Sequence, residues 1–152
     1  MAIRNIVKEG DDVLLKKCRM VEKFDRKLAE LIDDMFDTMY DAGGVGLAGP
    51  QVGILRRVVV IDIGDGPLEL VNPEIIEKRG VQKESEGCLS CPGVWGITKR
   101  PLWVKVRAQD RLGIYHEYEG QDLLARAFCH EIDHLDGILF RERVVEYVDP
   151  DR

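Results

Sequence analysis

The chain has 152 residues, of which 45% are hydrophobic and 33% are charged, and its net charge is −6. This size and composition suit one globular domain over residues 1–152. The sequence lacks the run of roughly 20 apolar residues that crosses a membrane and the apolar run of a secretory signal, and its acidic balance gives no direct sign of nucleic-acid binding. We therefore expect a soluble, cytoplasmic protein that uses neither membrane nor nucleic acid.

Apolar residues at helical spacing predict the first regular element, an amphipathic helix over about residues 25–40. The residues that form its apolar face are Phe24, Leu28, Leu31, Ile32, Met35 and Met39. Asp25 can cap the start of this helix and Gly43 can end it. We interpret the apolar face, including its methionines, as part of the core.

A glycine-rich loop over residues 43–53 follows, and the next stretches have the pattern of strands. A continuous apolar run predicts a buried strand over residues 58–63. A second strand, over residues 68–73, is expected to stop at Asn72-Pro73, after which the chain stays extended as far as a turn at Gly80. Residues 86–96, "EGCLSCPGVWG", have the composition of a loop.

The third quarter of the chain predicts a hairpin, because residues 102–110 and 114–119 have strand patterns on either side of the turn sequence "DRLG". The basic residues at its start are expected to lie on a solvated strand face. A second helix is expected from about Gln121 to His134. Since strands and helices do not alternate regularly, we expect an α+β fold with mostly antiparallel strands.

The second helix contains "HEIDH", which has the pattern of a metal-binding motif. His130 and His134 are spaced i and i+4, so both rings project from one face, with Cβ atoms about 6 Å apart. Imidazole nitrogen binds Zn²⁺ and Fe²⁺, and Glu131 lies beside that face, where it can act as a general base. A surface pair of histidines is the alternative, but the apolar residues around this helix indicate burial, which would be costly for a glutamate without a purpose.

A catalytic metal usually has three protein ligands, and the two histidines supply only two of them. The candidates are Glu142 and Glu146 downstream, His116 on a predicted strand, and Cys88 in the predicted loop. We favour Cys88, because a thiolate binds such metals tightly.

Cys88 and Cys91 also form a C-x-x-C pair, which raises two other interpretations. A redox motif of this kind usually opens a helix, whereas Pro92-Gly93 follows here, and a structural zinc site would need a second pair. We favour neither. Without a secretory signal, a disulfide framework is not expected.

Three stretches, in this order, resemble the three motifs of the peptide deformylase family: "GVGLAGPQ" at residues 44–51, "EGCLS" at 86–90 and "HEIDH" at 130–134. The resemblance covers essentially the whole chain. It implies an α+β fold in which mostly antiparallel strands pack around a central helix that carries the HExxH motif. It also implies a metallohydrolase that removes the formyl group from N-formylmethionyl nascent chains and releases formate.

The resemblance also implies roles for individual residues. It implies the metal ligands Cys88, His130 and His134, the general acid/base Glu131, and oxyanion stabilisation by the Gln51 amide and the Leu89 backbone N–H. One divalent ion is expected, Fe²⁺ in the cell, with Zn²⁺, Ni²⁺ and Co²⁺ as alternatives. The expected partner is a nascent chain at the ribosome, and the expected state is a monomer.

The substrate's methionine side chain needs an apolar slot, which the resemblance places at Val45, Leu123 and Ala127. Helical geometry agrees, because the last two lie near the His130 direction. Gly46 belongs to the loop whose glycines let backbone pass close to the peptide. Arg100 aligns with a family position that contacts the peptide backbone, and its alternative role is a surface strand charge.

Three residues depart from the family's usual pattern. Gly49 stands in place of an alanine, which is expected to loosen the loop. Cys91 replaces an aliphatic residue, which is conservative for packing. Cys129 replaces a glutamine before the first histidine, which puts in doubt any hydrogen bond that orients a ligand.

Two alternatives to a deformylase remain. A zinc endopeptidase could use the same histidines, and it predicts a third ligand among the downstream carboxylates. A non-catalytic member could bind peptide amino termini with the metal as a structural element, but binding alone would need neither Glu131 nor Gln51.

Overall fold

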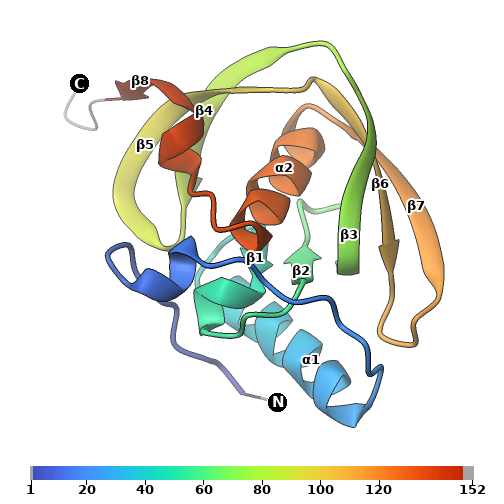
Figure 1. Ribbon diagram of the computed structural model, residues 1–152. Coiled ribbons are helices and arrows are strands. Elements are labelled where there is room, and N and C mark those ends of the chain that lie inside the picture. Colours follow the sequence, from blue (N-terminus) through green and yellow to red (C-terminus); the bar gives the residue numbers. More distant parts are fainter. Residues whose placement is uncertain (1, 149–152) are drawn as a thin grey trace.

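The computed structural model describes residues 2–148, which form two helices, eight strands and three short 3-10 helices (Figure 1). The helices are α1 (Arg26–Asp41), α2 (Leu123–Leu135), η1 (Asp12–Leu15), η2 (Gly49–Val52) and η3 (Phe140–Arg143). The strands are β1 (Gly46–Ala48), β2 (Val58–Ile61), β3 (Leu68–Arg79), β4 (Gln82–Cys88), β5 (Cys91–Arg100), β6 (Trp103–Gln109), β7 (Tyr115–Gln121) and β8 (Val144–Val148). Across the described residues, no helix combines the length and the apolar character that a membrane span requires.

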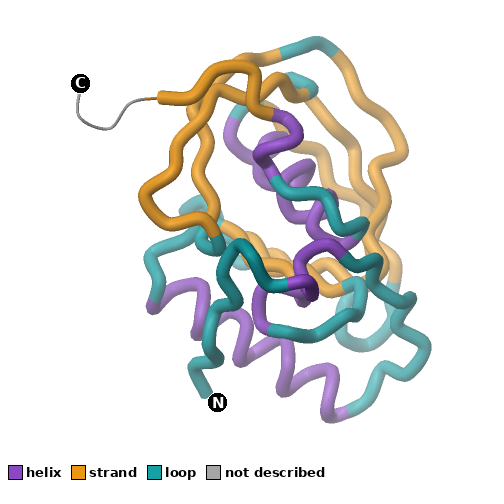
Figure 2. The backbone as a smooth tube through the Cα atoms, turned by 60° about the vertical axis from the view of Figure 1, so that its left-hand side comes forward, coloured by secondary structure: helices purple, strands orange, loops and turns teal. Residues whose placement is uncertain are grey.

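The strands of the described residues form two sheets, with orders β1-β2-β3-β6-β7 and β4-β5-β8. Neighbouring strands are antiparallel in both sheets. Helix α2 lies between the sheets, and α1 packs outside (Figure 1). Figure 2 shows the same relation from another side, with strands wrapping around α2. The expected α+β fold, mostly antiparallel around a central HExxH helix, is confirmed.

Strand β2 joins two parts of the core, because successive side chains of a strand point to opposite faces. Val59 and Ile61 pack in the cluster around α2, whereas Val58 and Val60 pack in the cluster around α1. All four side chains are fully buried. This explains why the sequence of β2 is a continuous apolar run rather than an alternating one, and each such valine contributes about 1.5–3 kcal/mol through burial.

The predicted first helix is confirmed, and so is its cap. The Asp25 side chain accepts a hydrogen bond from the Leu28 N–H at 3.0 Å, and Ala42 forms the other end, followed by Gly43 with a positive φ of 70°. Leu28, Ile32, Met35 and Met39 are buried in the α1 cluster as expected. The predicted hairpin of β6 and β7 and the predicted second helix are also present.

The expected end of a strand at Asn72-Pro73 is wrong, because β3 continues to Arg79. Asn72 adopts a positive φ of 52°, and the pairing with β6 shifts register between Val71 and Glu74. The Asn72 side chain accepts a hydrogen bond from the Val21 N–H at 2.8 Å and donates to the Val21 carbonyl at 2.9 Å. This irregularity accommodates the proline inside a long strand.

The loop expected at residues 86–96 is in fact a hairpin. Strand β4 pairs with β5 around a turn at Leu89-Ser90, and β8, near the end of the described chain, pairs with the other edge of β5. Glycine and polar residues gave this segment the composition of a loop. Three consecutive residues of β4, at 83–85, are solvent-exposed, and the strand lacks the apolar alternation that would identify it in the sequence.

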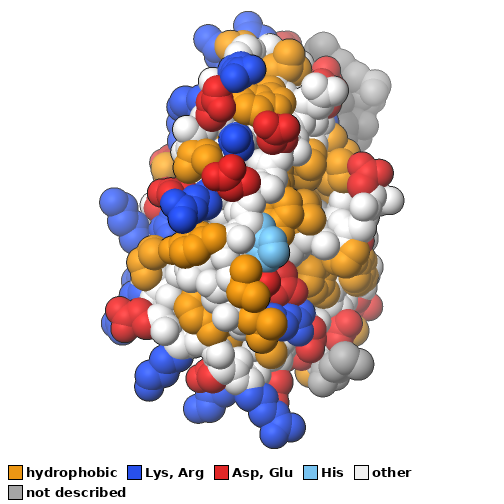
Figure 3. All heavy atoms as spheres, turned by 90° about the vertical axis from the view of Figure 1, so that its right-hand side faces the viewer, with side chains coloured by type: hydrophobic (Ala, Val, Ile, Leu, Met, Phe, Trp, Pro, Cys, Tyr) orange, Lys and Arg blue, Asp and Glu red, His pale blue; other side chains and the backbone are white. Residues whose placement is uncertain are grey.

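The basic stretch at residues 99–107 ends on a solvated strand face, as expected. Lys105 lies 3.5 Å from a Glu117 carboxylate oxygen, and the Arg107 guanidinium stacks over the Tyr115 ring. On the face shown in Figure 3, basic, acidic and apolar side chains are interspersed rather than gathered in one basic patch.

The Asp25 cap provides a test of how local sequence stabilises the fold. We expect Asp25→Ala to lower the free energy of unfolding by about 1 kcal/mol, because the Leu28 N–H loses its acceptor. Asp25→Asn keeps an acceptor and should stay close to the wild type. Chemical denaturation of the three proteins measures this, and an equal loss in both variants would contradict the capping role.

Candidate metal centre and active site

Helix α2 supplies three buried polar side chains to the centre of the molecule. His130, Glu131 and His134 are 6%, 4% and 0% exposed. Their burial follows from the helix sequence, because Phe128, Ile132 and Leu135 pack in one apolar cluster with residues of the five-stranded sheet. A buried imidazole or carboxylate is stable only where it finds a charged, hydrogen-bonding or metal partner.

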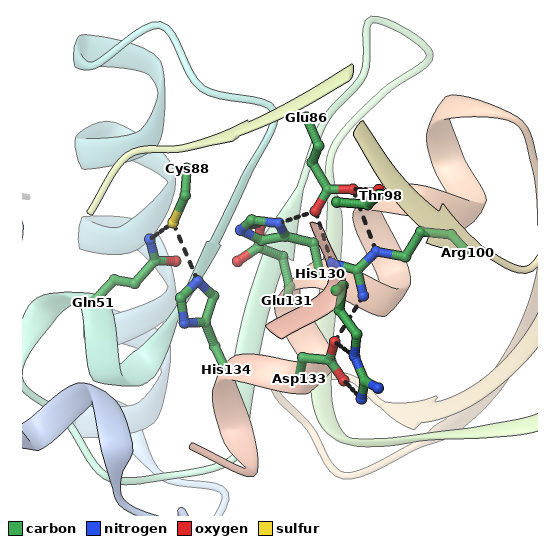
Figure 4. Close-up of polar contacts among 10 residues, drawn as sticks. Gln51, Glu86, Cys88, Thr98, Arg100, His130, Glu131, Asp133 and His134 are labelled. Atoms are coloured by element: carbon green, nitrogen blue, oxygen red, sulfur yellow. Dashed lines mark hydrogen bonds and ion pairs between the residues drawn. The ribbon is translucent and has the colours of Figure 1, made fainter. Parts of the chain in front are cut away.

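The turn of the β4–β5 hairpin brings Cys88 to this helix. The Cys88 Sγ lies 3.4 Å from the His134 Nε2, and the donor atoms of Cys88, His130 and His134 all lie within 4.8 Å of one another. Figure 4 shows Cys88 and His134 pointing toward each other beside Gln51. The three residues that the sequence suggested as ligands are thus assembled from segments more than forty residues apart.

The other candidates for the third ligand lie elsewhere. His116 is exposed, and its Nε2 lies 2.8 Å from the Asp110 carboxylate. Glu142 and Glu146 are exposed near the end of the described chain, and neither belongs to the donor cluster. The downstream carboxylate ligand that a zinc endopeptidase would need is therefore absent from residues 2–148.

The orientation of His130 is fixed by Glu86, a residue to which sequence analysis gave no role. The His130 Nδ1 lies 2.5 Å from the Glu86 Oε1, which leaves Nε2 to face the cluster. Glu86 also accepts hydrogen bonds from Thr98 at 2.8 Å and from Arg100 at 2.7 Å. The spacing in the sequence could have indicated this role. Glu86 and Cys88 are two residues apart, so on a strand their side chains share a face.

Arg100 does not occupy either of its expected positions. It is 4% exposed, and it binds Glu86 on β4 and Asp133 on α2, each with an N–O distance of 2.7 Å. It is not among the residues that line the cavity. Both the predicted peptide contact and the alternative of a surface strand charge are therefore wrong. Strand β5 ends at the interface of the hairpin with α2, where two carboxylates need a cation (Figure 4).

Gln51 is 1% exposed and has a fixed side-chain amide. Its Oε1 accepts a hydrogen bond from the Ala48 N–H at 3.0 Å, while its Nε2 donates to Ser90 Oγ at 3.1 Å and lies 3.6 Å from the Cys88 Sγ. The amide nitrogen therefore faces the same space as the donor cluster. Leu89 follows Cys88 in the turn and lines the same cavity.

A cavity of about 500 Å³ opens beside the donor cluster. The residues expected to bind the substrate, Val45, Gly46, Leu123 and Ala127, all line it, as do Gln51 and Glu131. Sequence analysis missed Trp95, which is half-exposed on β5 and lines the cavity too. Trp95 lies in the segment that sequence analysis interpreted as a loop, so nothing pointed to its position on a strand.

The position of Gly46 requires a glycine for a second reason, besides the close approach of the substrate. A Cβ on Gly46 would lie 2.6 Å from the Glu131 Oε2, so any side chain would displace this carboxylate. Gly49 is also tightly fitted, since a Cβ there would lie 2.6 Å from the Ile54 carbonyl oxygen. The expectation that Gly49 loosens the loop is therefore wrong for this packing.

Cys129 packs in the core cluster around α2, and burial raises the pKa of its thiol to about 11. His130 does not depend on this position for its orientation, because Glu86 holds its Nδ1. The departure from glutamine therefore leaves the orientation of the first histidine intact.

Burial shapes the acid–base properties of the site. Burial raises the pKa of Glu131 to about 7, although the nearby His130 opposes this shift. Burial and the neighbouring His130 lower the pKa of His134, which keeps its imidazole neutral. Burial also tends to raise the pKa of Glu86, but hydrogen bonds from His130 and Arg100 outweigh it and bring the pKa to about 2.

The donor set and its surroundings fit one divalent metal ion. One thiol and two imidazoles are a common ligand set for Fe²⁺, Zn²⁺ and related ions. Within residues 2–148, the buried side-chain atoms without a hydrogen-bond partner are Glu131 Oε1 and His134 Nδ1, both on the segment that bears the ligands. A buried carboxylate oxygen left free beside three metal donors indicates a polar group that binds there.

Comparisons with known proteins agree on one family. A family model described as polypeptide deformylase matches residues 3–149. A peptide deformylase of Caldicellulosiruptor bescii is 58% identical over 148 residues, which is 97% of this chain and 89% of that protein. The crystal structure of peptide deformylase from Thermotoga maritima has a TM-score of 0.91 and 43% identity, covering 93% of this chain and 97% of that one. A peptide deformylase of Synechococcus elongatus in complex with actinonin has a TM-score of 0.90 and 41% identity, covering 93% and 80%.

The contact between Glu86 and His130 predicts a loss of metal affinity in Glu86→Gln. The amide would no longer favour the Nδ1–H tautomer of His130, so we expect affinity to fall about 10–100-fold. A competition titration with a chelator measures this. Glu84→Gln, which changes an exposed glutamate two residues earlier on the same strand, is the matched control. Unchanged affinity in the Glu86 variant would contradict the orienting role.

Proposed function

The chain belongs to the polypeptide deformylase family and removes the formyl group from the amino terminus of nascent peptides, and we propose that it does so in the cavity beside Cys88, His130 and His134. The observation that carries this assignment is the convergence of those three donors next to a buried carboxylate, Glu131, with no hydrogen-bond partner for one of its oxygens. We propose Cys88, His130 and His134 as the ligands of one divalent ion, which lowers the pKa of water and polarises a carbonyl group when it is bound.

Glu131 acts as the general base and then as the general acid. Because its pKa is about 7, both its protonated and its ionised forms are accessible near neutral pH. The carboxylate accepts a proton from the water that attacks the formyl carbon. It then delivers this proton to the departing amino nitrogen, so that the C–N bond breaks and formate and a free amino terminus are released. Gly46 lets the carboxylate take this position.

The side-chain amide of Gln51 and the backbone N–H of Leu89 stabilise the negative charge that develops on the formyl oxygen. The Gln51 amide is already fixed by Ala48 and Ser90, so little reorganisation is needed when the charge appears. One such donor typically contributes about 3–4 kcal/mol to transition-state stabilisation.

The substrate's methionine side chain fits the apolar part of the cavity, formed by Val45, Leu123 and Ala127. Strand β1 is an edge strand of one sheet and β4 of the other, and residues from both line the cavity. An extended peptide that enters there can pair with such an edge as an added strand. Arg126, whose Nη1 donates to Gln82 at 2.6 Å, lies at the cavity wall.

We further propose that the protein acts in the cytoplasm as a monomer, on nascent chains at the ribosome. The substrate supports this location, because a nascent chain is held at the ribosome while it is synthesised. Mass measurement in solution tests the monomeric state.

The catalytic assignment is tested by formate release from formyl-Met-Ala-Ser. We expect turnover by the metal-loaded protein and a loss of about 10²–10⁴-fold in kcat/KM for Glu131→Gln, with its metal content retained. Cys88→Ala should abolish metal binding. Metal binding that survives in Cys88→Ala would favour a ligand set of the endopeptidase kind. If the metal-loaded wild-type protein showed no turnover, the catalytic assignment would be wrong, and only a role in binding peptide amino termini would be left.

We propose Fe²⁺ as the ion in the cell, with Zn²⁺, Ni²⁺ and Co²⁺ able to occupy the same donors. An Fe²⁺ ion beside a thiolate is sensitive to oxygen, so anaerobically prepared protein should contain iron and lose activity in air. Nickel-loaded protein is the control and should keep its activity under the same exposure. Equal stability of both forms in air, or a purified anaerobic protein that contains zinc, would contradict the assignment of iron.

A further inference from the structure

Cys91 faces the proposed metal ligand Cys88 across the tip of the β4–β5 hairpin. The two residues are Cα partners on either side of the Leu89-Ser90 turn. Both thiols are free, and both residues line the same cavity. Directly opposed residues of antiparallel strands have Cα atoms about 4.5–5.5 Å apart, which lies within the range that a disulfide bridges.

The deformylase reaction gives Cys91 no task. Its sulfur does not belong to the donor cluster of Cys88, His130 and His134 in the described chain, so it is not positioned as a fourth ligand. Cys91 is only 3% exposed, yet it lines the cavity together with Cys88. A small molecule that enters the active site therefore comes next to both residues.

We propose that Cys88 and Cys91 form a reversible oxidation site, in which a hydroperoxide converts the two thiols to a disulfide and releases the metal ion. The proposal rests on the proposed role of Cys88 as a ligand. It differs from a dithiol oxidoreductase, because the pair lies at the tip of a hairpin and its product is an inactive state of the same enzyme.

The chemistry balances with hydrogen peroxide as the oxidant. The Cys88 sulfur attacks one peroxide oxygen, the O–O bond breaks, and Cys88 becomes a sulfenic acid while one water leaves. The Cys91 sulfur then attacks the Cys88 sulfur, an S–S bond forms, and the hydroxyl group leaves as a second water. Two thiols and one peroxide thus give one disulfide and two waters, and Cys88 no longer offers a thiolate to a metal.

Cys91 would in this way limit the damage to Cys88. A sulfenic acid without a neighbouring thiol proceeds to sulfinic and sulfonic acids, which ordinary thiol reductants do not reverse. With Cys91 directly opposite on the paired strand, the disulfide forms first, and a reductant with fresh metal restores the site. The aliphatic residue usual at this position in the family would offer no such protection.

Peroxide treatment of nickel-loaded protein tests the proposal. Metal content and formate release are measured first, so that a failure of the proposed function is recognised before any oxidant is added. We expect treated wild type to release its metal, to lose two hydrogen atoms in a peptide that links Cys88 with Cys91, and to regain metal binding after dithiothreitol and nickel are added.

Two variants serve as comparisons. Cys91→Val should start with the wild-type metal content, and after peroxide it should carry added oxygen atoms on Cys88 that dithiothreitol does not remove. Cys18→Ala, which changes a half-buried thiol outside the cavity, should behave as the wild type does. Oxygenated Cys88 beside an intact Cys91 thiol in the wild type would overturn the proposal, as would full reversibility in Cys91→Val.

Discussion

The hydrogen bond between Glu86 and His130 connects the two parts of the protein that make the site. It joins the β4–β5 hairpin, which carries Cys88, to helix α2, which carries both histidines. Arg100 strengthens the same junction by binding Glu86 on one side and Asp133 on the other. Removing one partner of such a buried charge network typically costs about 3–5 kcal/mol, because the remaining charge stays buried without compensation. The position of the thiol relative to the imidazoles therefore depends on this contact.

The apolar packing around α2 stabilises the fold and also sets the chemistry of the site. Side chains from both faces of β2 are fully buried, with α2 on one side and α1 on the other. The same lack of solvent raises the pKa of Glu131 to about 7 and lowers the pKa of His134. An exposed helix with the same motif would leave its glutamate ionised and its histidines partly protonated near neutral pH. The site thus requires a helix at the centre of the molecule.

The sequence predicted the elements whose signals are local. Helical periodicity identified α1 and its Asp25 cap, and the i, i+4 histidines together with the "EGCLS" motif identified the donors that the structure assembles. The hairpin that carries Cys88 was not predicted, because its glycines and polar residues give it the composition of a loop and it lacks an apolar alternation. The position of Arg100 depends on two carboxylates from distant segments, Glu86 and Asp133, and a single sequence does not reveal such a partnership. Gly46 was interpreted through the substrate alone, whereas its contact with Glu131 appears only in three dimensions.

The central claim is that one thiolate and two imidazoles, held by the junction of hairpin and helix, bind the catalytic ion. X-ray absorption at the zinc edge of zinc-loaded protein examines this ligand set directly. The account predicts one sulfur neighbour at about 2.3 Å and two nitrogen neighbours at about 2.0–2.1 Å. A first shell that contains only nitrogen and oxygen would contradict it, because Cys88 would then not be a ligand.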